Sequence, residues 1–552
     1  MQFDAGSLKK ILLTSGYVSE KDVAEAERLA VTRRTSFLDE LLNEGYISPD
    51  ILGQAAAEYF AVPYADLNSH QPSKEQVLKI PEAMAKEWRI VVFEEKKTSV
   101  VVTTDDPAKK GLKEILKSLF PTGKVAVAYS LPEDIDVAIT QYRQTLETRF
   151  ATIMKEGNRV APELLDILFT DAIDLRTSDI HFEPSEEDVL VRFRVDGVLR
   201  DVAHLPKEQY ENILNRIKVQ SGIRLDEHFS AQDGSMQFRK DAFTVDLRTS
   251  IVPTVEGEKV VLRVLGSYVQ GLGLSEIGFS KQHQEMIQAA ADKPFGMILV
   301  AGPTGSGKTT TLYALLKVLN QSDVNITTIE DPVEYKMKGV NQIQVNTATN
   351  LSFANGLRSI VRQDPDVILV GEIRDEETAE IAVNAALTGH LLLSTFHAND
   401  AATAIPRLID MAIEPFLLAS TIELVVAQRL VRKICDHCRM SVSMKGTDIT
   451  KGRADLKQYF PGPKYTVYQG KGCEICGHSG FHGRTALFEL IQITPELQNI
   501  ILKNPSAQEL WKLARSQGAR TMFEDGIEKV KSGVTTMDEL MRVAEPPKDI
   551  AV

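Results

Sequence analysis

The chain has 552 residues, of which 43% are hydrophobic and 25% are charged, the composition of an ordinary globular protein. This length predicts roughly three or four domains, and the net charge of −13 argues against a general nucleic-acid binder, so we expect no nucleic-acid partner. No apolar run approaches the roughly 18 residues that span a bilayer, and no signal peptide is visible, so we expect a cytoplasmic protein.

The first 68 residues contain an internal repeat. Residues 12–19 (LLTSGYVS) recur as residues 41–48 (LLNEGYIS), offset by 29 positions. Each copy predicts a short helix that ends at a glycine, followed by a serine N-cap that opens a second helix. Pro49 follows the second serine, at the first helical position, where proline is tolerated. We therefore expect a small helical subdomain over residues 1–68.

Two α/β segments follow. Residues 69–145 contain strand-like runs at 90–93, 99–103 and 124–128, and they predict a small α/β subdomain. Residues 160–270 begin with an apolar helical stripe at 164–168. They continue with the alternating run 189–195, which ends at Asp196-Gly197, a strong hairpin signal. We expect a mixed α/β domain here, with a sheet that is half exposed.

A phosphate-binding motif follows the apolar run 297–301. Residues 302–309 match G-x-x-x-x-G-K-[ST], the P-loop, and 309–316 predicts the helix that leaves it. Glycines let successive backbone N–H groups face a polyphosphate. We expect Lys308 to reach the β- and γ-phosphates and Thr309 to ligate Mg²⁺. The predicted nucleotide-binding residues are Gly302, Pro303, Thr304, Gly305, Ser306, Gly307, Lys308, Thr309 and Thr310.

Two acidic strand ends accompany the P-loop. The apolar run 367–370 closes at Gly371-Glu372, which would place an acid near Mg²⁺. Residues 327–329 lead into a second group of acids, Glu330, Asp331 and Glu334. Their carboxylates suit the orientation and deprotonation of a water. Because strand and helix patterns alternate over residues 280–552, a parallel, doubly wound sheet is expected there.

Histidines flank another apolar run. His390 and His397 stand at the two ends of residues 391–396. A buried strand with a histidine at each end is common in proteins without any role for the histidines. The segment Ala398-Asn399-Asp400 after it contains two polar residues and favours a strand that ends at the nucleotide site.

The four cysteines form two pairs with C-x-x-C spacing, at Cys435/Cys438 and Cys473/Cys476. Two such pairs supply four thiolates for a tetrahedral Zn²⁺. The 34-residue gap between the pairs exceeds the usual zinc-ribbon spacing and implies a small inserted subdomain. Disulfides are disfavoured in a cytoplasmic chain, and a redox pair needs only one such motif. His437 and His478 are alternative ligands, although four cysteines already close the site.

Four motifs in order resemble one family. Residues 302–309, 329–335, 363–375 and 388–400 are similar to the Walker A, Asp-box, Walker B and His-box motifs of the type II secretion and type IV pilus assembly ATPases. The resemblance implies a RecA-like P-loop domain over 280–552 with a zinc-binding subdomain at about 432–485. It also implies a PAS-like pre-ATPase domain over 160–270, because 177–181 and 192–197 resemble that domain.

The resemblance implies roles at matching positions. Glu334 would be the general base, Glu372 would help to hold Mg²⁺ through water, and His397 would contact the phosphate region. Arginines on the phosphate side of the site would be Arg358 and Arg362, and the pre-ATPase domain would offer Arg248 and Arg263 to the γ-phosphate. One departure is Gly257-Glu258-Lys259, where arginine more often follows the glutamate, and this puts a local contact in doubt.

The first 150 residues resemble the family more loosely. Some members bind cyclic di-GMP there at repeated Arg-Leu-Gly positions. Gly6-Ser7-Leu8 and Thr35-Ser36-Phe37 stand at those positions here, without the arginines that would pair with phosphate. A docking module is therefore favoured over a cyclic di-GMP site, which stays open as the alternative.

The resemblance implies a homo-hexameric ATPase that uses ATP, Mg²⁺ and Zn²⁺ to power type IV pilus assembly or extension of a type II secretion pseudopilus. Its partner would be an inner-membrane platform protein, through which it would attach peripherally to the membrane. A nucleic-acid translocase is the first rival, and the lack of a dense Lys/Arg stripe argues against it. A nucleotide-gated scaffold is the second, and it would need no general base such as Glu334.

Overall fold

The computed structural model describes residues 5–33, 36–43, 45–67, 70, 72–96, 99–121, 124–139, 142, 160–240, 243–265, 272–473 and 475–547. The chain divides into two units, one made of Met1–Arg143 with Gly273–Val552 and the other of Gln144–Leu272. Among the described helices, none combines the length and the apolar character that crossing a membrane requires.

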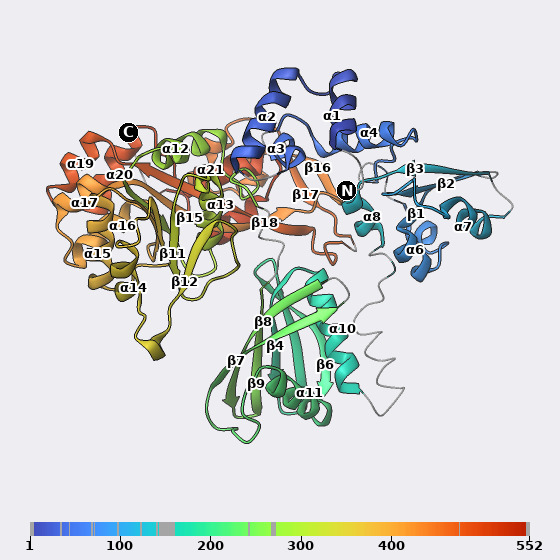
Figure 1. The fold of residues 1–552 in the computed structure, drawn as a ribbon, viewed down its shortest axis with the longest axis horizontal. Coiled ribbons are helices and arrows are strands. Elements are labelled where there is room, and N and C mark those ends of the chain that lie inside the picture. Colours follow the sequence, from blue (N-terminus) through green and yellow to red (C-terminus); the bar gives the residue numbers. More distant parts are fainter. Residues whose placement is uncertain are drawn as a thin grey trace. The chain divides into compact units, whose positions relative to one another are not determined.

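The N-terminal repeat folds as two helix pairs, α1 (Ala5–Thr14) with α2 (Glu20–Arg33) and α3 (Phe37–Asn43) with α4 (Pro49–Tyr59) (Figure 1). The two turns are alike: Gly16 and Gly45 have φ angles of 72° and 70°. The Ser48 side chain accepts from Ile51 N, so it caps α4 as the sequence predicts. Thr35, from one of the two tripeptides compared with a cyclic di-GMP site, lies outside the described residues.

The next segment is a three-stranded sheet with short helices. β1 (Ile90–Lys96) pairs antiparallel with β2 (Ser99–Thr104), and β2 pairs parallel with β3 (Lys124–Tyr129). These strands contain the three runs that the sequence predicts. The accompanying helices are α5 (Lys74–Val77), α6 (Glu82–Trp88), α7 (Leu112–Leu119) and α8 (Pro132–Ile139).

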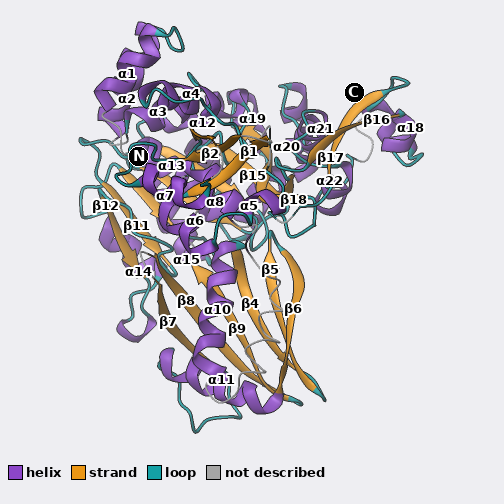
Figure 2. Cartoon of the chain, turned by 90° about the vertical axis from the view of Figure 1, so that its right-hand side faces the viewer, coloured by secondary structure: helices purple, strands orange, loops and turns teal. Residues whose placement is uncertain are grey.

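The second unit is a six-stranded antiparallel sheet of order β6-β5-β4-β9-β8-β7, packed against two helices (Figure 2). Asp196 and Gly197 both have positive φ and form the predicted hairpin turn between β5 and β6. Along β5 buried and half-buried residues alternate, so one face of the sheet meets the helices and the other is polar. The elements are α10 (Val160–Asp174), β4 (Thr177–Pro184), β5 (Asp188–Val195), β6 (Val198–Pro206), α11 (Lys207–Gln220), β7 (Gln232–Lys240), β8 (Phe243–Thr254) and β9 (Gly257–Leu265).

The P-loop domain is built on a seven-stranded sheet of order β12-β11-β13-β14-β10-β15-β18. All neighbouring strands are parallel except β15 and β18, which are antiparallel. Every residue of β10, β11, β13 and β14 is buried, because helices cover both faces. The strands are β10 (Gly296–Ala301), β11 (Ile326–Glu330), β12 (Val340–Gln344), β13 (Val367–Val370), β14 (Leu391–Phe396), β15 (Ile422–Ile434) and β18 (Phe481–Gln492).

The helices of this domain begin with α12 (Lys281–Ala291) and α13 (Lys308–Leu319). One large apolar core joins the strands to the helices that follow α13. These are α14 (Phe353–Ile360), α15 (Glu376–Leu387), α16 (Ala401–Asp410), α17 (Pro415–Thr421), α19 (Pro495–Ile501), α20 (Ala507–Ser516), α21 (Met522–Lys531) and α22 (Met537–Val543). The predicted doubly wound α/β fold is confirmed, with β18 as an antiparallel edge.

A small lobe is inserted between β15 and β18. It contains the two-stranded ribbon of β16 (Arg439–Met444) and β17 (Tyr465–Gly470), with α18 (Gly446–Ile449) and the 3₁₀ helix η4 (Ala454–Tyr459) between them. Met444, Tyr465 and Val467 of the ribbon pack against the main core. The lobe therefore has one apolar anchor on the P-loop domain.

A buried carboxylate joins two helices to the edge strand. Glu489 on β18 is only 6% exposed and accepts from Ala401 N at 2.9 Å, and it also accepts from the backbone of Met522. These are the first residues of α16 and α21, where unpaired N–H groups favour an acceptor. Burial nevertheless raises the pKa of Glu489 to about 7.

This shift predicts a pH dependence of stability. An unfolded glutamate has a pKa near 4.3, so between about pH 4.5 and 7 the folded chain holds a proton that the unfolded chain has lost. The Glu489 contribution to the free energy of unfolding should therefore fall by about 3 kcal/mol as pH rises through this window. Urea unfolding of the wild type and of Glu489→Gln at pH 5, 6 and 7 measures it. Identical pH slopes for the two proteins would contradict this assignment.

Candidate nucleotide and metal sites

The P-loop joins a buried central strand to the helix that follows. β10 ends at Ala301 and α13 begins at Lys308. Gly305 and Gly307 have φ angles of 77° and 89°, a left-handed conformation that glycine adopts without steric cost. The Lys308 ammonium group folds back on the loop and donates to the carbonyl oxygens of Gly302, at 2.9 Å, and Pro303, at 3.1 Å. Thr309 and Thr310 follow in the first turn of α13, half buried.

Parallel pairing brings three predicted residues to one edge of the sheet. Ala301 of β10 is paired with Phe396 of β14, and Val370 of β13 is paired with Ser394. Lys308, Glu372 and His397 come from the segments that leave the carboxyl ends of these three strands. Ligands bind outside the carboxyl ends of strands in open α/β sheets. The sheet topology therefore gathers the residues that the sequence proposes for phosphate and metal.

The Glu372 carboxylate interacts with the basic side chains gathered at the carboxyl ends of these strands. It accepts a hydrogen bond from Arg374, and its second oxygen lies 3.3 Å from His397 Nε2. Burial alone would raise the pKa of Glu372, but Arg374 and His397 together hold it below its usual value. Burial lowers the pKa of Lys308, while the Glu372 charge acts in the opposite direction. Glu372 is thus kept ionised, as a metal ligand must be.

The two glutamates of the Asp box have different environments. Glu330 is 3% exposed and accepts from Thr328, Tyr313 and Gln342. Burial raises its pKa, and these hydrogen bonds oppose the rise. Glu334 is exposed, and its backbone N–H donates to Tyr313 Oη at 3.4 Å. Glu330 is therefore an internal anchor of the loop, whereas the Glu334 side chain reaches solvent.

The two arginines predicted on the phosphate side lie in and after α14. Arg358 pairs with Glu377, in the first turn of α15, at 2.6 Å, and also donates to Asn355. Arg362 is exposed two residues beyond the end of α14. Among the hydrogen bonds of the described residues, none joins either arginine to the P-loop.

Arg248 and Arg263 face each other in the second unit, on β8 and β9. Arg263 also faces Asp179 of β4, and its Nε lies 3.2 Å from one carboxylate oxygen of Asp179. Arg194 Nε lies 3.5 Å from the other oxygen. Across the neighbouring strands β5, β4, β9 and β8, the residues in line are Arg194, Asp179, Arg263 and Arg248. Asp179 thus lies between two arginines, and the Arg263 side chain remains 63% exposed.

The lysine that departs from the family pattern keeps an ion pair. Lys259 Nζ lies 2.8 Å from Glu183, which also pairs with Arg192. Burial alone would raise the pKa of Glu183, but these two cations lower it to about 2. Lys259 therefore provides a positive partner for Glu183 on the polar face of the sheet.

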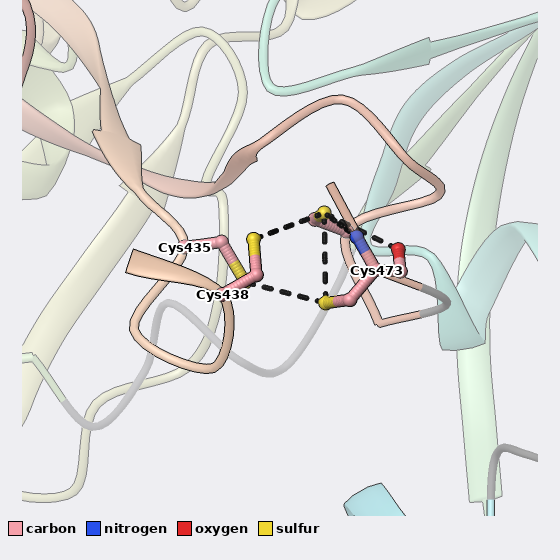
Figure 3. Close-up of side chains that lie close together, drawn as sticks. Cys435, Cys438 and Cys473 are labelled. Carbon is pink, nitrogen blue, oxygen red and sulfur yellow. Dashed lines mark hydrogen bonds between the residues drawn. The ribbon is translucent and has the colours of Figure 1, made fainter. Parts of the chain in front are cut away.

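The four cysteine sulfurs lie within 4.8 Å of one another (Figure 3). Cys435 to Cys473, Cys438 to Cys476 and Cys473 to Cys476 are separated by 3.8, 3.9 and 3.7 Å. Disulfide sulfurs lie about 2.05 Å apart, so these are four thiols. Ligands about 2.3 Å from a tetrahedral Zn²⁺ lie about 3.8 Å from one another, which agrees with the spacing here. The residues therefore fit a zinc ion.

Backbone donors support this cluster. The N–H groups of Gly472, Cys473 and Gly480 point at the sulfurs of Cys438 or Cys476 at 3.1–3.3 Å. Such hydrogen bonds stabilise thiolates rather than thiols. Burial raises the pKa of the Cys435 and Cys438 thiols, whereas hydrogen bonds outweigh burial at Cys476 and lower its pKa. A bound cation is therefore needed to hold all four as thiolates.

Sequence reasoning missed several partners of the predicted residues. Tyr313 and Gln342 hold Glu330 and lie outside the family motifs. Arg374 holds Glu372 and lies inside the 363–375 motif, but no role was expected for it. The burial of Glu330 had a signal: it ends a β-branched run, and a polar group in a buried strand must find partners. Its partners in α13 and β12 are distant in sequence, so no local pattern identifies them.

The fold, together with Lys308, Glu372 and His397 at the carboxyl ends of the central strands, defines a P-loop ATPase. Residues 154–542 match the family described as type II/IV secretion system protein, and residues 60–149 match the MshEN domain. The chain belongs to the type II/IV secretion system protein family, and the resemblance seen in its motifs is confirmed.

Individual proteins agree with this assignment. The type IV pilus assembly ATPase PilB of Pseudomonas aeruginosa is 34% identical, over 98% of each chain. PilB of Thermus thermophilus is 36% identical over 91% of this chain, which spans only 58% of that protein's length. The X-ray structure of the Legionella pneumophila ATPase DotB covers 70% of this chain and 96% of its own, with a TM-score of 0.52 and 22% identity, and it supports the fold.

The cysteine cluster makes a prediction about metal content. Purified protein should carry about one zinc per chain, and Cys438→Ser should lose it because three thiolates leave a tetrahedral ion open. The control is His478→Asn, which suits the left-handed backbone at that position (φ 59°) and should keep the full zinc content. Elemental analysis measures both. Loss of zinc in the histidine variant but not in the cysteine variant would contradict the four-cysteine site.

Proposed function

We propose that this chain works as a homo-hexamer that hydrolyses ATP at the P-loop and drives type IV pilus assembly or type II pseudopilus extension through an inner-membrane platform protein. It would act in the cytoplasm, held at the membrane by that partner. Family membership supports this proposal. The observation that carries it is the meeting of Lys308, Glu372 and His397 at the carboxyl edge of β10, β13 and β14.

In this proposal each residue at the edge has one task. Lys308 leaves the carbonyl oxygens of its own loop and binds the β- and γ-phosphates. Thr309 and, through water, Glu372 would hold Mg²⁺, which would supply positive charge against the phosphates. His397 contacts the phosphate region and is held by Glu372. Arg358 and Arg362 add positive charge once Arg358 releases Glu377.

Glu334 is the proposed general base. Hydrolysis needs a water in line with the γ-phosphate and a group that accepts its proton. Glu334 is the exposed carboxylate of the Asp box, and Tyr313 Oη and buried Glu330 fix the backbone of its loop. Glu330 thus anchors the loop, while the Glu334 carboxylate stays at the surface, where a general base can reach a substrate.

Arg248 and Arg263 would complete the site when the second unit closes on the P-loop domain. Asp179 accepts from Arg263, and the γ-phosphate is a stronger anion that would replace it. Closure that assembles a catalytic set is a common way to gate hydrolysis. In this proposal the closing movement is the power stroke.

For the remaining parts we propose structural zinc at the four cysteines and docking at the N-terminal helices. The MshEN match falls on residues 60–149, beyond most of the helical repeat. A cyclic di-GMP site in the first 150 residues is kept as an alternative. Titration of the protein with cyclic di-GMP tests it directly.

Lys308→Ala should abolish ATP hydrolysis because the β- and γ-phosphates lose their cation. Zinc content should be unchanged, since the cysteine cluster is built separately. Lys281→Ala, at an exposed lysine that opens α12, is the control and should hydrolyse ATP normally. Steady-state phosphate release measures all three proteins. Full turnover by Lys308→Ala would refute the site assignment.

Arg263→Ala and Arg248→Ala should each lower kcat by about 10³–10⁵ if they act on the γ-phosphate in the transition state. Affinity for ADP should change little, because ADP lacks that phosphate. Arg239→Ala, at an exposed arginine of β7 outside the row, is the matched control.

Scattering of the assembled ring with and without a non-hydrolysable ATP analogue then tests the closure itself. Unchanged kcat, or identical scattering curves, counts against the closure.

A further inference from the structure

A buried glutamine lies directly beneath the P-loop. Gln428 on β15 is 1% exposed, and it follows Ala427, which is paired with Ala301 at the end of β10. The β15 chain therefore continues under the loop at the point where β10 turns into it. A Cβ added at Gly302 would lie 2.7 Å from the Gln428 carbonyl oxygen, so strand and loop are in close contact there.

The Gln428 amide makes two hydrogen bonds that differ in direction. Its Nε2 donates to the carbonyl oxygen of Ser306 at 2.7 Å. Its Oε1 accepts from the Thr311 hydroxyl at 2.7 Å. One side chain thus holds the last turn of the loop and the first turn of α13. Because a carbonyl oxygen can only accept, the Ser306 carbonyl fixes the NH2 end of the amide toward itself, and the Thr311 hydroxyl donates to the other end.

The bond to Ser306 has a consequence for the next amide. In a planar trans peptide the C=O and N–H groups point in opposite directions. With the Ser306 oxygen drawn inward to Gln428, the Gly307 N–H must point outward, toward the open side of the loop. Within the described residues this N–H has no protein acceptor. Outward-facing amides are the groups that a P-loop offers to phosphate.

We propose that Gln428 is a positioning residue for nucleotide binding: it fixes the Ser306–Gly307 peptide so that the Gly307 N–H faces the phosphates. Gln428 itself touches no phosphate. Its effect comes from preorganisation, since a peptide already held in place needs no reordering when the anion arrives. Glycine at position 307 is part of the same device, because an added Cβ would lie 3.2 Å from Gln428 Nε2.

This inference rests on ATP binding at the P-loop, and ADP is the probe that tests it. Gln428→Met keeps the length of the side chain and removes both hydrogen bonds. The Kd for ADP should rise about ten- to a hundredfold, the value of one hydrogen bond to a charged group. Gln492→Met, at the exposed end of β18, should bind ADP as the wild type does. Titration calorimetry on the full chain measures each Kd.

A second pair of variants separates positioning from loss of folding. Thr311→Val removes the hydroxyl that donates to Gln428 Oε1 and anchors that end of the amide, whereas Thr311→Ser keeps it. We expect weaker ADP binding for the valine variant, near wild-type binding for the serine variant, and no additional loss when Thr311→Val is combined with Gln428→Met. A role in stability alone would lower the melting temperature and leave the Kd of the folded protein unchanged.

The outcomes are distinct. If the wild type binds ADP and folded Gln428→Met binds it equally well, the inference is overturned while the ATPase assignment stands. If Gln428→Met does not fold, equal affinities of Thr311→Val and Thr311→Ser overturn it instead. Failure of the wild type itself to bind ADP would overturn the proposed function together with this inference.

Discussion

The pairing of β10 with parallel neighbours on both sides is the constraint on which the nucleotide site depends. β14 pairs with β10 from Gly296 to Ala301 and β15 pairs with it from Met297 to Ala301, and all six residues of β10 are buried. The strand cannot shift without exposing this run or breaking two ladders. Its carboxyl end is therefore a fixed point, and the P-loop, Glu372 and His397 are placed relative to it.

Buried carboxylates of the P-loop domain find two kinds of partner. Glu330 and Glu489 accept from neutral donors, so no cation is buried with them. Asp525 pairs instead with the largely buried Lys529. On the polar face of the second unit, Asp179 and Glu183 lie among arginines and a lysine. Pairs with a solvent-exposed partner such as Arg263 contribute little to stability. Arg263 can therefore exchange Asp179 for another anion at small cost.

Local patterns predicted a large part of this structure. The P-loop, the Asp196-Gly197 hairpin, the strand at 367–370 and the paired cysteines each occupy a short stretch of sequence, and the fold class that they indicate is the one observed. The supporting residues are different. Gln428 and Ser306 are 122 positions apart, and Glu489 and Ala401 are 88 apart. Their contacts exist only once the sheet has formed, so a single sequence carries no periodic or spacing signal for them.

The position of the inserted lobe has a consequence for how such a chain can vary. Ile434 is paired with Phe481, and Cys435 N donates to Gly480 O at 3.0 Å, so the chain leaves the sheet and re-enters it at adjacent points. The residues between these two points form the lobe, and the pairing of β15 with β18 does not depend on how many there are. A short turn would join the same two strands equally well. The register of β15 with β18 is thus set independently of the cysteine lobe, and what the lobe adds is cover for the apolar core, against which Met444, Tyr465 and Val467 pack.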